Sequence, residues 1–515
     1  MPLTHLHIAS FYQNMFGSSG DINLTELFEM IASKNTLREL FLGVSNPCIF
    51  SHQYLSDEFD VIAEPSLIVR PDVMQDLIPL IQNHKARRFA LGVVLNNPKG
   101  SELVRIIEAC LSNRTTPLRE FHLQVDTRID GVVVNRTECG KKGVPCNIQN
   151  PFISLGDITQ LTVLRVFSKS PQCISAFVTV LDALSEKLSL VDLGLWIDAK
   201  ETKFSMENFE KIESAVNKMN FLERLSFEFS RIDQFDNNPL ATMTMFLKPK
   251  HLTHLRIKSE RPLQFSTDIP TLRYLNLECS SSISGLEHFA GLEKLHLDCD
   301  KLSQFPQQAA LAFRNLRQLY IKAPLTSIPP ELFGINSPLE KLTLSRCKCA
   351  SVPDSLWALK HLKALNIGEN QFRLRDLPPT CFKNFTEIED LNLDRCGIKT
   401  IPCLSYMVKL ECLSIRSQYC RFSEEYPDDF APLANLKVLD VVDTSVSKIP
   451  PSLVKCRNLE QLLISSTGIY KLTKEFIATL LKLRKLEYLR WDRAGARFNM
   501  VNFTGDDLSR LLREY

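Results

Sequence analysis

The sequence predicts an α/β solenoid: a horseshoe of stacked repeats with a parallel β-sheet on the concave side and helices or 3-10 turns on the convex side. The phrase LxxLxL returns at Leu292, Leu316, Leu339 and Leu362, at steps of 24, 23 and 23 residues, and such a fixed period is typical of repeat folds. The last two leucines of each phrase are two residues apart, so they share one face of a short strand. One repeat cannot bury them alone, and stacking joins them into a continuous core.

Composition narrows the possible functions. Hydrophobic residues make up 44% of the 515 residues, and a net charge of +2 provides no strong attraction for nucleic acid or an anionic membrane. The 15 cysteines show no compact pairing and favour reduced thiols. The N-terminal residues show no signal-peptide pattern, and no apolar run approaches the length of a membrane span. We therefore expect a cytoplasmic protein without membrane insertion.

Residues 1–251 predict repeats of long period with full helices. Their phrases begin at Leu3, Leu37, Ala86, Leu118, Leu161, Leu190 and Leu222. Apolar residues at helical spacing follow several phrases, as in 100–113 and 205–219. A similar helix over 72–82 contains Pro79, which should end or kink it.

Two insertions, 45–71 and 124–160, interrupt the long repeats, and residues beside Gly131 suggest a hairpin in the second. Either insertion is a tolerated loop or a binding element.

Residues 252–491 predict repeats of short period, too short for long helices. Their phrases begin at Leu252, Leu272, Leu292, Leu316, Leu339, Leu362, Ile388, Leu410, Leu436, Leu459 and Leu486, which brings the candidate strands to 18. Seven repeats carry an apolar or aromatic residue followed by proline, from Phe305-Pro306 to Ile449-Pro450. Proline suits the first turn of a short helix, so we expect 3-10 or short helical turns there. Residues 492–515 predict a C-terminal cap that ends in a helix, and the whole chain is expected to form one continuous solenoid.

These phrases resemble the leucine-rich repeat superfamily over nearly the whole chain. The first half is similar to the ribonuclease-inhibitor-type class, and the second half resembles the cytosolic class with Ile-Pro or Leu-Pro after the turn. In the family, the ninth residue of a repeat hydrogen-bonds the backbone at the turn after the strand. The residues at that position here are Cys347, Asn370, Cys396, Thr444 and Thr467, and all of these types can form such bonds.

The sequence contains no recognisable catalytic constellation. It lacks a P-loop, HExxH, GxSxG and the Cys-x-Asp signature of the bacterial ubiquitin ligases that carry similar repeats. We therefore predict no enzyme activity, no catalytic residues, no metal and no cofactor. The rival interpretation is an enzyme that uses Cys139 or Cys146, with Lys141 and Lys142 lowering a thiol pKa.

The remaining candidate is the concave face, formed by the third, fifth and seventh residues of each repeat. Tyrosine and arginine there are the residue types that anchor protein interfaces. A basic block from His254 to Lys341 and an acidic block from Asp390 to Asp440 predict a dipolar partner. The predicted partner-binding residues are His254, Arg256, Lys258, Tyr274, His296, Tyr320, Lys322, Asp390, Asp394, Tyr488 and Arg490.

Two alternatives concern the same face. It can be an ordinary solvated surface, or the Arg256–Lys341 block can bind nucleic acid, although Glu278 and Asp298 dilute its charge. The aromatic residues Phe41, Phe167 and Trp196 are either covered by the insertions or form a contact patch.

The predicted function is non-enzymatic recognition of a protein partner, without nucleic acid or a small-molecule substrate. The resemblance implies three roles: the substrate-recognition subunit of a ubiquitin ligase, the sensor part of an immune receptor, or a microbial effector acting in host cytosol.

Overall fold

The computed structural model of the chain describes most of its C-terminal half and the repeat elements of its N-terminal half. The described residues are 3, 5–8, 24–34, 36–42, 67–69, 71–96, 105–106, 109, 119–128, 161–168, 178, 181–182, 185–186, 189–198, 206–230, 242–501 except for gaps at 335, 371, 375–376, 379, 402, 417–419, 423–429, 468, 470–473 and 494–495, and 506. They divide between two compact units, unit 1 (Met1–Leu272) and unit 2 (Arg273–Tyr515).

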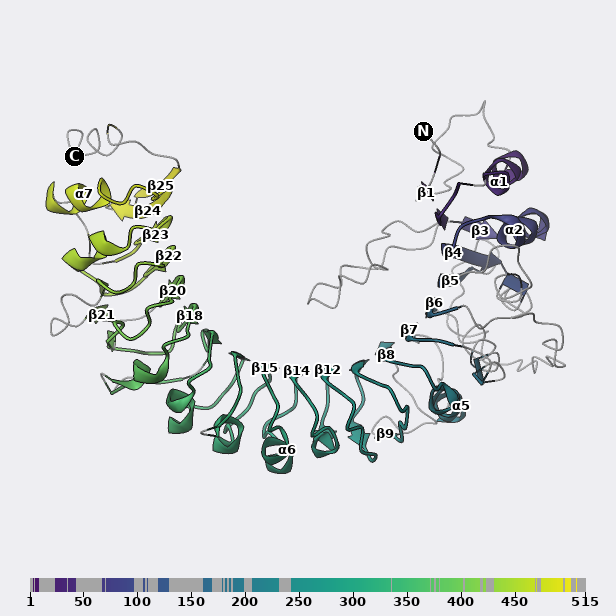
Figure 1. Cartoon of the computed structure of the whole chain (residues 1–515), viewed down its shortest axis with the longest axis horizontal. Helices are drawn as coiled ribbons and strands as arrows, with labels where there is room; N and C mark the ends of the chain where they lie inside the picture. The colour runs from purple at the N-terminus through teal and green to yellow at the C-terminus, as the bar shows by residue number, and fades with distance from the viewer. Residues whose placement is uncertain are drawn as a thin grey trace. The chain divides into compact units, whose positions relative to one another are not determined.

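Unit 1 contains a parallel sheet in which each repeat adds one strand (Figure 1). In pairing order its strands are β1 (His5–Ile8), β2 (Glu39–Leu42), β4 (Arg88–Asn96), β5 (Glu120–Arg128), β6 (Val163–Ser168), β7 (Asp192–Asp198), β8 (Arg224–Ser230) and β10 (His254–Ser259). A short strand β3 (Leu67–Val69) pairs with the far end of β4, and β9 (Met243–Met245) pairs with β11 (Leu263–Phe265). The end of the first predicted insertion is therefore part of the sheet.

The helices of unit 1 whose bounds lie within the described residues are α1 (Leu24–Ala32), α2 (Pro71–Asn83) and α5 (Met206–Lys218). The predicted apolar face of α5 is buried, with Phe209, Ile212 and Val216 at most 2% exposed. Of the two outcomes expected at Pro79, an end or a kink of the helix, the end is wrong, because α2 continues through Pro79 to Asn83. Pro79 and Gln75, whose carbonyl loses its donor, are both exposed, so water can replace the missing hydrogen bond.

Unit 2 contains a second parallel ladder, with its strands on the inner side of the curve and short helices on the outer side (Figure 1). In pairing order its strands are β12 (Tyr274–Cys279), β14 (Lys294–Cys299), β15 (Gln318–Lys322), β16 (Lys341–Ser345), β17 (Ala364–Asn366), β18 (Asp390–Asn392), β20 (Cys412–Ser414), β22 (Val438–Asp440), β23 (Gln461–Leu463) and β24 (Tyr488–Arg493). All 18 predicted strands are present among the described residues, and each begins two residues after its phrase opens.

The outer elements of unit 2 are short, as the period predicts. They are β13 (Ile283–Ser284), η3 (Leu286–His288), α6 (Gln307–Ala312), η4 (Pro330–Phe333), η5 (Asp354–Ala358), η6 (Cys381–Asn384), β19 (Thr400–Ile401), β21 (Arg421–Phe422), η7 (Pro451–Lys455) and α7 (Lys474–Leu480), where η denotes a 3-10 helix.

The position of the prolines differs from the prediction by one residue. Pro306, Pro329, Pro353 and Pro450 are N-cap residues with extended ψ angles rather than residues of the first turn. The proline ring fixes φ near the value that an N-cap residue needs. Pro402 and Pro427 lie outside the described residues.

The core of unit 2 is formed by the leucines of the phrase and by aromatic side chains beneath the helices. Leu391 and Leu413 are at most 1% exposed, and the rings of Trp357, Phe382 and Phe385 pack against one another with centroids 5.7–6.0 Å apart. Large apolar side chains buried in this way provide most of the stabilisation of a repeat array.

The last described strand closes the ladder differently from the others. β25 (Ala496–Val501) runs antiparallel to β24. The segment that was predicted to be a C-terminal cap ending in a helix therefore begins with a strand. Residues 507–515, where the terminal helix is expected, lie outside the described residues.

Candidate binding surface

The register of unit 2 arranges the third and fifth residues of successive repeats in two rows on the sheet face opposite the short helices. The third-position row is Tyr274, Lys294, Gln318, Lys341, Ala364, Asp390, Cys412, Val438, Gln461 and Tyr488. The fifth-position row is Asn276, His296, Tyr320, Thr343, Asn366, Asn392, Ser414, Asp440, Leu463 and Arg490. Side chains two residues apart on one strand share a face, so both rows belong to one surface, called here the concave face of unit 2.

Two predicted residues form an aromatic pair on this face. The rings of His296 on β14 and Tyr320 on β15 stack at a centroid distance of 4.0 Å with an interplanar angle of 13°. Both side chains are partly exposed. Lys322, also predicted, forms an ion pair with Asp298 at 2.6 Å, so the basic block has less free charge than its sequence indicates.

The two predicted aspartates of the repeat that begins at Ile388 have different environments. Asp394 is 7% exposed, and its Oδ1 accepts hydrogen bonds from Ser414 Oγ at 2.8 Å and from the Arg416 backbone N–H at 2.6 Å. Asp394 therefore supports the neighbouring turn and offers little surface to a partner. Asp390 is exposed and forms no hydrogen bond or ion pair with the described part of the chain. Partial burial raises the pKa of the Asp390 carboxyl, and Lys341 partly offsets this effect.

Further along the face, Asp440 lies among charged groups. Its Oδ1 accepts a hydrogen bond from the Val442 N–H at 3.1 Å, and Arg416 Nε is 3.6 Å from its Oδ2. Burial raises the pKa of Asp440 and Asp394 adds to this, whereas the Val442 N–H, Arg416 and Arg490 lower it. The predicted residue Arg490 forms no hydrogen bond or ion pair through its side chain with the described part of the chain, and its Nε is buried without a partner.

Tyr274 and Tyr488, both predicted, lie at the two ends of the third-position row and are partly exposed. Asn276, two residues after Tyr274 on β12, is only 4% exposed, and its Oδ1 has no hydrogen-bond partner among the residues that the structure describes.

The other predicted residues belong to β10 in unit 1. Arg256 is 8% exposed, whereas His254 and Lys258 are partly exposed. Lys258 forms an ion pair at 2.9 Å with Glu228, its register partner on β8. Of these three residues, His254 and Lys258 present accessible surface.

The sequence analysis missed an ionic cluster in unit 1. The Asp192 carboxylate, on β7, accepts from Arg165 Nη2 at 2.8 Å and from Arg224 Nε at 3.1 Å. The Asp192 side chain is 5% exposed, and the two guanidinium groups compensate its buried charge. The signal is available in the sequence, because Asp192 and Arg224 are consecutive third-position residues.

Trp196 is 7% exposed, and its Nε1 has no hydrogen-bond partner within the described part of the chain. Its ring lies over Gly194 on the same strand: a Cβ at Gly194 would stand 2.5 Å from Trp196 Cη2 and 3.1 Å from Arg165 Cγ. Phe41 is partly exposed, and the side chain of Phe167 lies outside the described residues. Trp196 is thus mostly covered, and Gly194 is needed for the close approach of its ring.

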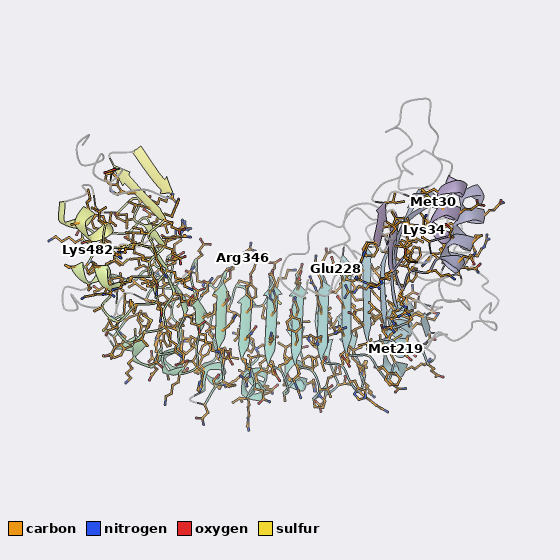
Figure 2. All side chains as sticks on the ribbon, turned by 45° about the horizontal axis from the view of Figure 1, so that its top comes forward. Met30, Lys34, Met219, Glu228, Arg346 and Lys482 are labelled. Carbon is orange, nitrogen blue, oxygen red and sulfur yellow. The ribbon has the colours of Figure 1, made fainter. Side chains whose placement is uncertain are left out.

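A row of strained residues follows the strands of unit 2. The eighth residues of five repeats have positive φ angles of 52–59° without being glycine: Arg346, Glu369, Arg395, Asp443 and Ser466. All five are exposed, and Arg346 lies where strand β16 ends (Figure 2). This conformation was not predicted from the sequence, because L-residues adopt it rarely.

The ninth residues bond the backbone, as the resemblance implies. Asn370 Nδ2 donates to the carbonyls of Leu344, Ile367 and Gly368, and its Oδ1 accepts from the Cys347 N–H at 2.7 Å. Cys396 Sγ donates to the Ile367 carbonyl at 3.3 Å. The hydroxyls of Thr444 and Thr467 donate to the carbonyls three residues before them.

Within the described part of the chain, the thiols have structural environments. Burial raises the pKa of Cys381, Cys420 and Cys456 to about 12. A hydrogen bond between the thiols of Cys347 and Cys349 raises the pKa of the first and lowers that of the second. Cys139 and Cys146, on which the enzyme interpretation depends, lie outside the described residues.

The described side chains include no group of three or more His, Cys, Asp or Glu that could hold a metal ion. A separate search of the described helices finds none with the length and apolar character that a membrane crossing requires.

The ladder of one strand per repeat gives the chain the fold of the leucine-rich repeat superfamily. No family model matches the chain. Among curated proteins it is similar to the volume-regulated anion channel subunit LRRC8D of Rattus norvegicus (27% identity, 35% of this chain), podocan of Mus musculus (24%, 40%) and the TMV resistance protein N of Nicotiana glutinosa (25%, 43%). The matches span 21%, 41% and 18% of the lengths of these relatives.

Similar solved structures include the leucine-rich repeat protein LIC12759 of Leptospira interrogans, with a TM-score of 0.40 and 19% identity over 57% of this chain and 79% of that one. The complex of TLR13 with ssRNA13 has a TM-score of 0.46 and 16% identity, over 88% of this chain and 60% of that one. The assignment of the two halves to particular repeat classes stays a prediction.

Proposed function

We propose that the chain is a non-enzymatic recognition module that binds a protein partner on the concave face of unit 2. The observation that carries the proposal is the stacked pair of His296 and Tyr320, partly exposed on adjacent strands. Two rings held against each other lose little side-chain freedom on binding, and tyrosine is enriched among interface hot spots. The polar rows on either side of the pair provide hydrogen-bonding groups for a rim.

Variants of the pair test this function. His296→Ala with Tyr320→Ala removes the anchor, and Arg314→Ala, an exposed residue that follows α6 on the helical side, is the matched control. Proteins captured from lysate by the unmodified chain are identified by mass spectrometry, purified and titrated against all three chains. We expect the double variant to weaken the captured partner by about 30-fold or more, the range of a hot-spot residue, and Arg314→Ala to leave it unchanged. Equal affinity for all three chains would overturn the proposal.

The resemblance implies three roles, one of which is the sensor part of an immune receptor. The aligned relative from Nicotiana glutinosa is named a TMV resistance protein, and it matches 43% of this chain. The identity of the titrated partner separates this role from that of a ligase subunit or an effector. A cytoplasmic location and the absence of nucleic-acid binding stay predictions.

A further inference from the structure

Five residues on successive strands of unit 2 form a path across the concave face. Asp390 on β18 is followed by its register neighbours Cys412 on β20 and Val438 on β22. The path then moves two residues along the strand, to Leu463 on β23 and its register neighbour Arg490 on β24. Its first residue is acidic, its centre is apolar and its last residue is basic. We call this set the charged path.

Within the described part of the chain, the two ends of the charged path interact with opposite charges only at longer range, Asp390 with Lys341 and Arg490 with Asp440. Neither the Asp390 carboxylate nor the Arg490 guanidinium forms a hydrogen bond or an ion pair with the described part of the chain. Other charged residues of this face form ion pairs at short range: Asp440 with Arg416, and Lys322 with Asp298. Charges of opposite sign on a partner would therefore meet unpaired groups at both ends, as electrostatic complementarity requires.

The centre of the charged path is apolar where the rest of this face is polar. Cys412, Val438 and Leu463 are all partly exposed. Residues two positions away on the same strands are polar, namely Ser414, Asp440 and Gln461. The apolar surface is thus one side chain wide, which suits an extended chain better than a helix with a diameter of about 10 Å.

The length of the path sets the spacing of the partner's charges. Four strand-to-strand steps of about 4.8 Å and a shift of two residues along the strand, about 6.6 Å, separate Asp390 from Arg490, so the ends are about 20 Å apart. An extended chain advances about 3.3 Å per residue and covers that distance in about six residues.

We propose that the charged path binds an extended peptide segment with a basic side chain opposite Asp390, an apolar side chain over Val438 and Leu463, and an acidic side chain about six residues away opposite Arg490. This inference rests on the proposed function of the concave face and specifies the chemistry of the partner's segment.

Selection from a library of random displayed peptides tests the inference on the full chain. The unmodified chain should enrich peptides with one basic and one acidic residue on either side of an apolar residue. Arg490→Glu makes both ends acidic and should enrich peptides with two basic residues. Asp390→Lys makes both ends basic and should enrich peptides with two acidic residues. The affinity of a peptide selected on the unmodified chain should fall about tenfold in either variant.

Two charge reversals beside the path are matched controls. Glu389→Lys and Arg484→Glu change exposed charges that precede β18 and β24 and should leave the enriched pattern unchanged. Thermal melting of each variant, followed by circular dichroism, confirms that it is folded before selection. The inference is overturned if the unmodified chain enriches no peptide, or if the charges of the enriched peptides do not follow the substitutions at Asp390 and Arg490.

The two proposals fail separately, because His296 and Tyr320 are not part of the charged path. If the His296 and Tyr320 variant binds the protein partner more weakly but no peptide is selected, the proposed function stands and the charged path is excluded. If the charges of the selected peptides follow the charge reversals but the His296 and Tyr320 variant binds the partner normally, the charged path stands. The main contact then lies away from the aromatic pair.

Discussion

Gly194 shows how a single residue determines the packing of an aromatic side chain. Its missing side chain leaves the space that the Trp196 ring fills, and a Cβ there would lie 2.5 Å from Cη2 and 2.6 Å from Cζ3. The sequence analysis recognised Trp196 as an aromatic residue on the concave side, but it could not show that the ring folds back over its own strand. That contact depends on the side-chain rotamer, which the repeat pattern does not specify.

We expect Gly194→Ala to lower the free energy of unfolding by about 1–3 kcal/mol, because the indole must leave its position to accommodate the new methyl group. Chemical denaturation measures the change, and hydrogen exchange of β7 locates it. Gly334→Ala is the control, since the nearest atom to its Cβ is the Glu331 carbonyl oxygen at 3.9 Å, and it should change stability by less than about 0.5 kcal/mol. Similar losses in both variants would exclude the role assigned to the ring.

The turns after the strands show which details of an element follow from sequence. The resemblance predicted that ninth residues bond the backbone, and Asn370, Cys396, Thr444 and Thr467 do so. The positive φ angles one residue earlier, as at Arg346, were not predictable, because arginine has no preference for that conformation. Pro79 differs in the opposite direction, because proline disfavours the interior of a helix and yet the helix continues through it. Its position is exposed, so the missing backbone hydrogen bond is tolerated.

Asn370 connects two turns and should contribute more than the threonines at the same position. We expect Asn370→Ala to lower the free energy of unfolding by about 2–4 kcal/mol, because it removes the two N–H donors that three backbone carbonyls share and the oxygen that accepts from the Cys347 N–H, all at largely buried backbone groups. Thr467→Ala removes one donated and one accepted bond and should cost about 1–2 kcal/mol. Urea denaturation of both variants makes the comparison, and an equal or smaller loss for Asn370→Ala would contradict the bridging role.

At the scale of the whole molecule, the sequence predicted the ladders well and the surface only in part. The leucines specify the strands because their burial leaves one register possible. The pairing of β3 with β4 and the antiparallel β25 were not predicted, since neither strand carries the phrase. Alternation alone predicted which residues share a sheet face, but the counter-ion of Lys322 and the hydrogen bonds of Asp394 depend on neighbouring repeats.

The ladder also predicts how damage spreads within unit 2. Leu391→Ala, at a fully buried position, should cost about 2–5 kcal/mol. In a repeat array each unit is stabilised by its neighbours, so hydrogen exchange should accelerate most in β17, β18 and β20 and least in β12 and β24. Val408→Ala, in which the side chain is 46% exposed, is the control and should have little effect. Uniform acceleration across unit 2 would indicate a single cooperative unit.

The phrases of unit 2 are 20 to 27 residues apart in sequence, whereas neighbouring strands of a sheet are always about 4.8 Å apart. Changes in the length of an outer segment therefore leave the interval between two residues of the concave face unaltered. That interval changes only when a whole repeat is gained or lost, and then by one full strand spacing. Mutation can thus alter the side chains that meet a ligand and the distance between them independently, the first by substitution and the second by duplication or deletion of repeats.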